Sequence, residues 1–362
     1  MNLTSTNSIV YNLFSGITDL ANMWLERFQT EGRNLYLFGA GSAGLCFSYT
    51  FQQYGISVTA FCDNNPQKVG TVFHGLPVVS FEEMKQDHNK FVVISAVNAF
   101  DVLIRQCETA GIPADDICSI DWLWFDKDDK ELILNRIDDF VSAYSHCSDD
   151  LSKQVFTTAL INRYMRDRRI YKNNMCDGIM YFDNDILHLR QGQEVFLDCG
   201  AAFGDTATQF LSLFGGKVYA YEPDDLEYQK LLHTVKGNPD IITVHAGLGD
   251  AVCTRRFNNS SFDIGGTFEE GGNQAAQVQT IDLSLSEVPT FIKMDIQGYE
   301  LNALQGAEET IRQHKPKMAI CIYHKTSHFF DIPNYIFSLR PDYKMYVRHY
   351  RDDVGDTICY FI

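Results

Sequence analysis

Short apolar runs alternate with helix-like segments in the first third of the chain. The runs read LYLFGA, SVTAFCD and KFVVISA, and the segments between them space their apolar residues as an amphipathic helix does. Strands that alternate with helices are typical of βαβ units, so we expect a small parallel sheet within residues 31–120. Ahead of it, residues 1–30 are predicted to hold one amphipathic helix. Its apolar positions are Ile9, Leu13, Leu20, Trp24 and Phe28.

The same alternation returns after a more polar stretch. Residues 121–185 carry helical patterns, clearest in KELILNRIDDFVSAYS, and they contain no Pro/Gly/Ser-rich tract, so we interpret them as a helical connector. Seven apolar runs follow: EVFLD, KVYAYE, IITVHAGLG, FIKMD, MAICIYH, YKMYVRHY and TICYFI. The last two are joined by the short turn RDDVGD and should pair antiparallel. We therefore expect a second α/β domain, with a mostly parallel sheet that has one antiparallel strand near an edge.

Composition narrows the functional classes. The chain has 362 residues, enough for two or three domains, and a formal charge of −17. Such acidity disfavours nucleic acid and anionic membranes as partners. No apolar run has the length of a membrane span, and the N-terminus lacks the basic region of a secretory signal, so we expect a cytoplasmic protein. Ten cysteines are scattered without a CxxC pair, which disfavours a zinc cluster and is typical of reduced thiols.

Polar side chains stand at the ends of several predicted strands of the second domain. Asp198 ends the first strand, Glu222 the second, Asp295 the fourth and His324 the fifth, and His349 lies near the end of the sixth. Each alone could be a helix cap or a solvated loop residue. In open α/β sheets, however, ligands bind outside the carboxyl ends of the strands, and five ionisable groups at one edge exceed what packing requires. We therefore predict a functional site there.

The spacing between the first two of these acids indicates an adenosine-like ligand. Asp198 and Glu222 are 24 residues apart, so Glu222 falls where an acid can accept hydrogen bonds from two ribose hydroxyls. Asp198 and Asp205 flank the intervening turn, and they would repel a pyrophosphate at the helix start. The two carboxylates instead suit an adenosine ligand that carries positive charge, and S-adenosylmethionine is such a ligand.

The turn between these two acids reads CGAAFGDT. Gly200 and Gly204 allow the backbone to approach a ligand closely. Asp205 and Thr206 are cofactor-binding candidates, with helix capping as the alternative. Cys199 is interpreted as a small buried residue rather than a nucleophile.

A different turn, GAGSAG, follows the first strand of the N-terminal sheet. Gly39, Gly41 and Gly44 have GxGxxG spacing with no acid between them, and Asp63 ends the next strand, 19 residues after Gly44. This arrangement tolerates a pyrophosphate, so we predict a second nucleotide site for NAD or a nucleotide sugar. The alternative is a tight packing turn that holds no ligand.

Three stretches, VFLDCGAAFGDTA, VYAYEPD and FIKMDIQGYELNALQGA, together resemble the FkbM-type methyltransferases, as does the tail AICIYHK…DIPNYI with YKMYVRHY. The resemblance covers residues 180–362 and implies a class I methyltransferase fold with a seven-stranded sheet. It also implies S-adenosylmethionine as the cofactor, with Asp198, Gly200 and Gly204 in the first cofactor motif and Glu222 at the ribose. Members of this family mostly methylate oxygen, often on sugars or secondary metabolites.

The same resemblance matches Lys293, Asp295, Gly298 and Glu300 to a KxDxxGxE signature, in which Gln297 replaces a common glutamate. The stretch FCDNNPQKVGTVFHGLPVV is similar to nucleotide-binding domains of sugar-modifying enzymes. The expected organisation has four parts: an N-terminal helix (1–30), a Rossmann-like nucleotide- or nucleotide-sugar-binding domain (31–120), a helical connector (121–185) and an FkbM-type methyltransferase domain (186–362).

Methyl transfer to a hydroxyl needs an aligned acceptor and a base for its proton. His324 is the first candidate base because its ordinary pKa suits neutral pH, the alternative being a hydrogen-bonded strand-end histidine. Asp295 is expected to orient the acceptor, contact the cofactor or hold a divalent metal. Asp295, His324, Asp331 and His349 could supply a metal site, but their spacing is not diagnostic, so no metal ligand is assigned. Lys293 is expected to form an ion pair with a nearby carboxylate.

Two other functions remain open at this point. One is an NAD-dependent or nucleotide-sugar-modifying enzyme of the dehydrogenase or epimerase type, which would use the GAGSAG turn. The other is a non-catalytic nucleotide-sugar binding protein. For a methyltransferase, we expect a small-molecule or glycan acceptor, with a nucleotide sugar as one candidate. The glycine-rich stretch 262–277 is either a mobile lid over that acceptor or a plain hairpin turn.

Overall fold

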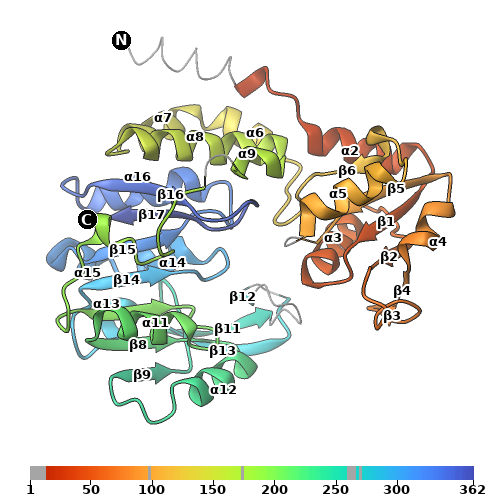
Figure 1. The fold of residues 1–362 in the computed structure, drawn as a ribbon. Helices are drawn as coiled ribbons and strands as arrows, with labels where there is room; N and C mark the ends of the chain where they lie inside the picture. Colours follow the sequence, from red (N-terminus) through yellow and green to blue (C-terminus); the bar gives the residue numbers. More distant parts are fainter. Residues whose placement is uncertain (1–13, 97–98, 173–174, 259–265, 269–270) are drawn as a thin grey trace. The chain divides into compact units, whose positions relative to one another are not determined.

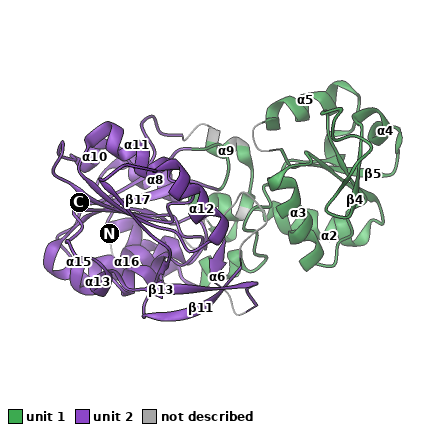
Figure 2. Cartoon of the chain, turned by 90° about the horizontal axis from the view of Figure 1, so that it is seen from below, with its two compact units in different colours: residues 1–135, 159–173, 351–354 green, residues 136–158, 174–350, 355–362 purple. Residues whose placement is uncertain are grey.

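The computed structural model describes residues 14–96, 99–172, 175–258, 266–268 and 271–362. The chain divides into two compact units (Figure 2). Unit 1 comprises residues 1–135, 159–173 and 351–354, and unit 2 comprises residues 136–158, 174–350 and 355–362. The segment 121–185 is therefore shared between the two units.

Unit 1 contains a six-stranded sheet with helices around it (Figure 1). The strand order is β3-β4-β2-β1-β5-β6, and every pair is parallel except the antiparallel pair of β3 and β4. The expected small parallel sheet is present, and β1, β2 and β5 coincide with the three predicted apolar runs. The short strands β3, β4 and β6 were not predicted from the pattern. The bounds are β1 Asn34–Phe38, β2 Ala60–Cys62, β3 Val72–Phe73, β4 Leu76–Val79, β5 Lys90–Ile94 and β6 Ile117–Cys118.

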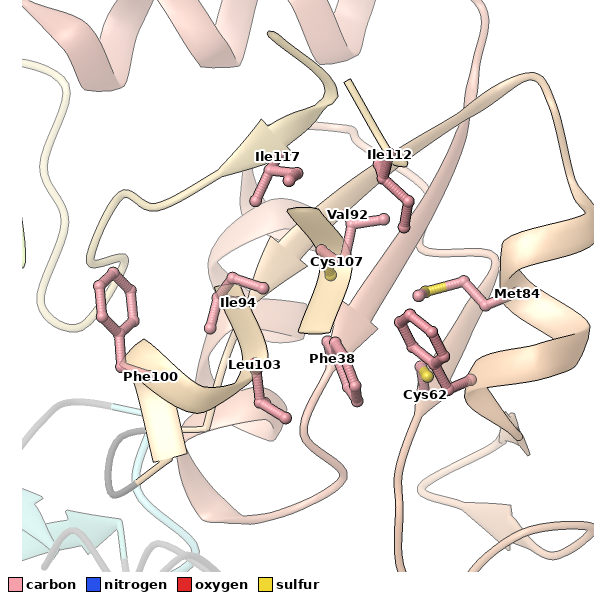
Figure 3. Packing of buried hydrophobic residues seen from close by; sticks show 11 residues of the cluster. Phe38, Cys62, Met84, Val92, Ile94, Phe100, Leu103, Cys107, Ile112 and Ile117 are labelled. Atoms are coloured by element: carbon pink, nitrogen blue, oxygen red, sulfur yellow. The ribbon is translucent and has the colours of Figure 1, made fainter. Parts of the chain in front are cut away.

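Apolar side chains of this sheet and of two helices form a core in unit 1. Figure 3 shows Phe38 and Val92 from neighbouring strands in one cluster with Leu103, Cys107 and Met84 from the helices. The removal of these side chains from water supplies much of the stabilising free energy of such a unit. The helices are α2 Leu20–Thr30, α3 Ser42–Gln53, α4 Phe81–Gln86, α5 Phe100–Thr109, α6 Asp129–Asn135 and α9 Arg168–Lys172. Residues 1–13, in which the predicted N-terminal helix would begin, lie outside the described residues.

Unit 2 is organised around a seven-stranded sheet in the order β16-β17-β15-β14-β7-β8-β9. Strands β7, β8, β9, β14 and β15 are parallel, whereas β17 is antiparallel to both of its neighbours. The antiparallel pairing of the last two strands is thus confirmed. Their bounds are β7 Val195–Cys199, β8 Lys217–Tyr221, β9 Ile241–Val244, β14 Phe291–Met294, β15 Lys317–Cys321, β16 Met345–His349 and β17 Thr357–Phe361.

A smaller four-stranded sheet in unit 2 was not expected from the sequence. Its order is β10-β13-β11-β12, and its main strands read CTRRFN and QAAQVQ, which are too polar to stand out as strands. The glycine-rich stretch 262–277 includes β12, which pairs antiparallel with β11, as the hairpin interpretation predicts. Residues 262–265 and 269–270 of this stretch lie outside the described residues, so the lid hypothesis is not tested for them. The bounds are β10 Gly247–Leu248, β11 Cys253–Asn258, β12 Thr267–Phe268 and β13 Gln274–Gln279.

The helical nature of segment 121–185 is confirmed in its first part, but its clearest stretch forms two helices. α6 ends at Asn135 and α7 begins at Ile137, because Arg136 leaves helical geometry and its guanidinium binds Asp331, with Nη2 2.7 Å from Oδ1. The remaining helices are α7 Ile137–Ser145, α8 Asp150–Met165, α10 Asn184–Leu187, α11 Asp205–Phe214, α12 Asp225–Thr234, α13 Ile281–Ser284, α14 Glu300–Gln305, α15 Glu308–His314 and α16 His328–Leu339. None of the helices among the described residues has the length and apolarity to cross a bilayer.

Candidate active site

Four neighbouring strands of unit 2 bring the predicted acids and a histidine to one edge of the sheet. β8, β7, β14 and β15 are adjacent and parallel, so their carboxyl ends meet at the same edge. Asp198 lies in β7, Glu222 follows β8, Asp295 follows β14, and His324 lies three residues beyond β15. The prediction that these four strand-end residues share an edge is confirmed.

The turn after β7 depends on two glycines. Gly200 has a φ of 79°, and a Cβ there would lie 2.1 Å from the carbonyl oxygen of Asp295, so any side chain would push the β7 and β14 loops apart. Gly204 has a φ of 90° and closes against Leu231 of α12. Gly204 also occupies the N-cap of α11, so neither Asp205 nor the residue after it is the N-cap.

A buried ion pair fixes this turn from behind. The Lys293 ammonium lies 3.0 Å from Oδ1 of Asp198 and donates to the Gly200 carbonyl at 2.7 Å, while the Thr206 hydroxyl donates to Oδ2 of Asp198. Burial alone would lower the pKa of Lys293, but the charges of Asp198 and Asp295 raise it, so the ammonium stays protonated. The expected ion pairing of Lys293 is confirmed. Asp198 therefore holds the turn through its partners.

Cys199, next to this pair, is fully buried. Burial, followed by the nearby charge of Asp198, raises the pKa of its thiol well above the ordinary range. A thiol in that state is a poor nucleophile, because the thiolate is the reactive form. The interpretation of Cys199 as a buried structural residue is confirmed.

Glu222 is a buried carboxylate that two backbone donors hold in place. Its Oε2 accepts the N–H of Ala202 and its Oε1 accepts the N–H of Asp224, both at 2.9 Å. Burial raises the pKa of Glu222 to about 7, and these two hydrogen bonds only partly oppose that effect. Each carboxylate oxygen has two lone pairs. Each oxygen of Glu222 can therefore accept one more hydrogen bond, which suits a ligand with two adjacent hydroxyls.

Asp295 is held by three side chains. Tyr181 donates its hydroxyl to Oδ2 at 2.7 Å, and Tyr323 donates to Oδ1 at 3.2 Å. Nε2 of His324 lies 3.3 Å from the same Oδ1. Asp295 is partly exposed, whereas His324 and both tyrosines are buried. Of this group, Asp295 is the side chain most open to an incoming molecule.

His324 lies between two carboxylates. On the side away from Asp295, its Nδ1 is 2.8 Å from Oε1 of Glu300, and Nδ1 of His328 is 3.2 Å from Oε2 of the same Glu300. Glu300 is fully buried. Burial would raise its pKa, but the two imidazoles outweigh burial and hold the pKa well below the ordinary range. The acid thus remains ionised beside His324.

Among the described residues, Asp295, Glu300 and His324 bring three potential metal-ligand atoms within 4.8 Å of one another. The two other residues considered as ligands lie elsewhere: Asp331 binds Arg136, and Nδ1 of His349 lies 2.9 Å from the Thr357 hydroxyl. A metal would also compete with the backbone N–H groups of Ile296 and Gly298, which Oε1 of Glu300 already accepts.

Three residues of this site had no role in the sequence reasoning. Tyr181 precedes the first strand of the sheet, and no motif links it to Asp295. Tyr323 looked like part of an apolar strand. His328 follows His324 by four residues, a spacing that could have suggested a shared partner for the two rings. The fold brings all three to the β14 and β15 strand ends.

In unit 1, two glycines of the GAGSAG turn serve close packing. A Cβ on Gly39 would lie 2.7 Å from the Ala96 nitrogen, and one on Gly44 would lie 2.1 Å from the Gly39 carbonyl oxygen. Gly41 differs, because a Cβ there meets no described atom within 4 Å. The turn therefore combines tight helix–strand packing with one open glycine at the start of α3.

Asp63 is engaged with the same turn. Its Oδ2 accepts the N–H of Ala40 at 2.9 Å, and its Oδ1 accepts the N–H of Asn65 at 2.8 Å. Lys68 lies 3.4 Å from Oδ2 and donates to the Ala40 carbonyl at 2.7 Å. Asp63 thus ties the loop after β2 to the glycine turn.

Comparison with known proteins identifies the domain that carries the site. Residues 198–348 match the family model of the methyltransferase FkbM domain. A crystal structure of methyltransferase FkbM from Methylobacillus flagellatus aligns with a TM-score of 0.73 and 24% sequence identity, covering 100% of this chain and 99% of that one. The resemblance noted in the sequence motifs is confirmed: residues 198–348 match the FkbM methyltransferase domain, and that family indicates a methyl transfer reaction.

Two further similarities are more limited. The redox-sensing transcriptional repressor Rex of Bacteroides fragilis is 28% identical over 93 residues, which are 25% of this chain and 42% of Rex. The chain thus matches less than half the length of that curated relative. Fibrillarin from Aeropyrum pernix, solved with bound S-adenosyl-L-methionine, aligns over 48% of this chain and 67% of its own with 12% identity and a TM-score of 0.33.

Proposed function

We propose that this protein transfers a methyl group from S-adenosylmethionine to a hydroxyl oxygen of a small-molecule or glycan acceptor. The observation that carries the proposal is Glu222, a buried carboxylate at the end of β8 with one remaining acceptor position on each oxygen. Adjacent ribose hydroxyls fill two such positions. The adenosine half of the cofactor would then lie across the ends of β7 and β8.

Strand order supports this placement. From β7 the sheet continues to β8 and β9 on one side and to β14 and β15 on the other, so β7 marks a topological switch point. Ligands of open α/β sheets bind in the crevice at such a point. The order is that expected for the class I methyltransferase fold. We assign the cofactor to β7 and β8, and the acceptor to the ends of β14 and β15.

Local charge favours a cationic cofactor over a dinucleotide. Lys293 and Asp198 neutralise each other, which leaves Asp205 and Asp295 as carboxylates around the turn. A sulfonium and an ammonium group gain from this field, whereas a pyrophosphate would be repelled. Gly200 and Gly204 keep the turn compact, so that the cofactor can contact the main chain of the turn.

We assign proton removal from the acceptor to His324 together with Asp295. Ionised Glu300 favours a proton on Nδ1 of His324, which aims Nε2 at the carboxylate oxygen of Asp295. Two lone pairs facing each other at that distance would repel, so the resting pair holds a proton on Nε2. The pair becomes a base once that proton leaves, and the rate of methyl transfer should therefore rise with pH.

Calorimetry on the full chain tests the cofactor. Wild type should bind S-adenosylmethionine, and Glu222→Ala should weaken binding by about 1.5–3 kcal/mol through the loss of hydrogen bonds to a charged group. Glu227→Ala, on α12 in an ion pair with Lys230, is the matched control and should bind normally. Equal affinity in wild type and Glu222→Ala would remove the ribose assignment.

The acceptor can be sought by transfer of isotopically labelled methyl groups to hydroxyl compounds, with release of S-adenosylhomocysteine as the second readout. With an acceptor in hand, His324→Gln should lower kcat by about 10²–10⁴ while cofactor affinity stays near wild type. A variant with normal kcat and an unchanged pH profile would assign the base to another residue.

For unit 1 we propose a Rossmann-like domain that binds a nucleotide or nucleotide sugar and has no redox role. One contrast favours it: the first turn of α3 has no acidic residue beside the open Gly41, whereas the first turn of α11 carries Asp205. A phosphate is therefore tolerated at the start of α3.

A further inference from the structure

We propose that Glu300 is a positioning residue that keeps His324 doubly protonated at rest and determines which of its two protons leaves. The proposal rests on the proposed function, since the charge of His324 matters for catalysis only if the ring faces an acceptor. The geometry behind it concerns the protein alone. It can therefore be tested without cofactor or acceptor.

Glu300 is itself fixed in place. Its Oε1 accepts the N–H groups of Ile296 at 3.0 Å and Gly298 at 3.3 Å, which ties the carboxylate to the turn between β14 and α14. Gln297 and Gly298 in this turn both have positive φ, of 55° and 93°, so the turn has a specific conformation. A carboxylate anchored in this way cannot follow the ring of His324. The ring has to adapt to the carboxylate.

The charged groups around His324 favour the imidazolium form. Ionised Glu300 on α14 faces Nδ1 and Asp295 at the end of β14 faces Nε2. On α16, His328 binds the far oxygen of Glu300. The neighbours of His324 in the chain are Tyr323, whose ring is tilted by 40° with its centroid 4.1 Å away, and the exposed Lys325. Within the described part of the chain, both ring nitrogens have a carboxylate oxygen within 3.3 Å. An opposite charge at this range favours the charged form of a histidine.

Around Asp295, the Tyr181 hydroxyl donates to Oδ2, the Tyr323 hydroxyl donates to Oδ1, and the Lys293 ammonium supplies an opposite charge. They stabilise the Asp295 carboxylate and compete with His324 for its charge. The Nε2 contact with Asp295 is 3.3 Å long, whereas the Nδ1 contact with Glu300 is 2.8 Å. The weaker contact loses its proton first. Nε2 is therefore the atom that becomes the proton acceptor, and Nδ1 stays protonated on Glu300.

The test is a pH titration of the full chain with ¹⁵N-labelled histidine, observed by NMR through the couplings of the ring protons to both ring nitrogens. His324→Gln identifies the resonances of His324 by their disappearance. In wild type, His324 should show the imidazolium pattern well above the ordinary histidine pKa of about 6.5, and then change to the form protonated on Nδ1.

Glu300→Gln keeps an oxygen for the backbone donors of the turn but removes the charge. The His324 titration should then move down by about 1–3 pH units. Glu308→Gln is the matched control, because Glu308 is an exposed acid that pairs with Arg312 on α15, and it should leave the titration in place. A structural role alone would lower stability without moving the midpoint.

Two results would overturn the proposal. One is an unchanged His324 midpoint in a folded Glu300→Gln protein. The other needs only wild type: His324 neutral at pH 7 with its proton on Nε2. The second result decides the matter even if Glu300→Gln does not fold. Neither depends on S-adenosylmethionine binding, so failure here is distinguishable from failure of the proposed function.

Discussion

Glu222 should make the stability of this protein depend on pH in a way that a single substitution reveals. Its pKa is raised to about 7 by burial, against 4.5 for the same carboxyl in water. A carboxyl with a raised pKa in the folded state stabilises the fold fully below pH 4.5. That contribution is lost as the pH rises through 7, because the folded state then has to bury a charge.

The size of the effect follows from the shift. The pKa rises by 7 − 4.5 = 2.5, and each pKa unit corresponds to 1.36 kcal/mol, which gives about 3 kcal/mol. Glu222→Gln removes the titration but not the shape of the side chain. Its amide group cannot accept hydrogen bonds from both Ala202 and Asp224, so it adds a destabilisation of about 1–3 kcal/mol that is independent of pH.

The measurement therefore compares, at two pH values, the difference in the free energy of unfolding between wild type and variant. Urea unfolding at pH 5 and pH 8 gives the free energy of unfolding of wild type and of Glu222→Gln. If several unfolding transitions are seen, the one to compare is the transition that added S-adenosylmethionine shifts in wild type. The advantage of wild type over the variant should shrink by about 2.5 kcal/mol between the two pH values, because a part of the full effect is already lost at pH 5. Glu227→Gln, with its ion pair to Lys230 on the surface of α12, should show no such change.

The same advantage at pH 5 and pH 8 would refute the reasoning, since it would mean that Glu222 titrates near its ordinary pKa despite its burial. A related consequence concerns the cofactor. Ribose hydroxyls donate to the ionised carboxylate, so binding should release protons near pH 7. Calorimetry in buffers of different ionisation enthalpy measures that release.

Three further predictions rest on other contacts. Lys293→Met should destabilise the protein by about 3–5 kcal/mol in urea unfolding, because it leaves Asp198 buried without its partner; recovery in the double variant with Asp198→Asn would show that the lost pairing is the cause. Tyr181→Phe should cost about 1.5–3 kcal/mol, since it removes a hydrogen bond to the Asp295 carboxylate, and a loss within experimental error would argue that this contact is absent in solution. Gly41→Asp should abolish calorimetric binding of a nucleotide or nucleotide sugar by unit 1, and turnover with oxidation of NADH would instead support a dehydrogenase.

The alternation of apolar runs determined much of the architecture. Each of the seven runs from Glu194 onward supplied a strand of the main sheet, because strands that are buried on both faces need continuous apolar residues. The strand-end positions of Asp198, Glu222, Asp295 and His324 were readable for the same reason. The polar strands β11 and β13 were not predicted, because they pair through backbone hydrogen bonds that the pattern of apolar side chains does not indicate.

What only the tertiary structure decided is how these strand-end residues share their partners. The sequence predicts Asp198 in the cofactor motif, and only the fold shows that Lys293 and Thr206 contact its two oxygens. His324 looked like a solitary base, yet two carboxylates from separate elements bracket its ring. Tyr181 reaches Asp295 from 114 residues away. Periodicity records which face of an element is buried, whereas hydrogen-bond partners depend on distances between elements, and those exist only once the sheet has assembled.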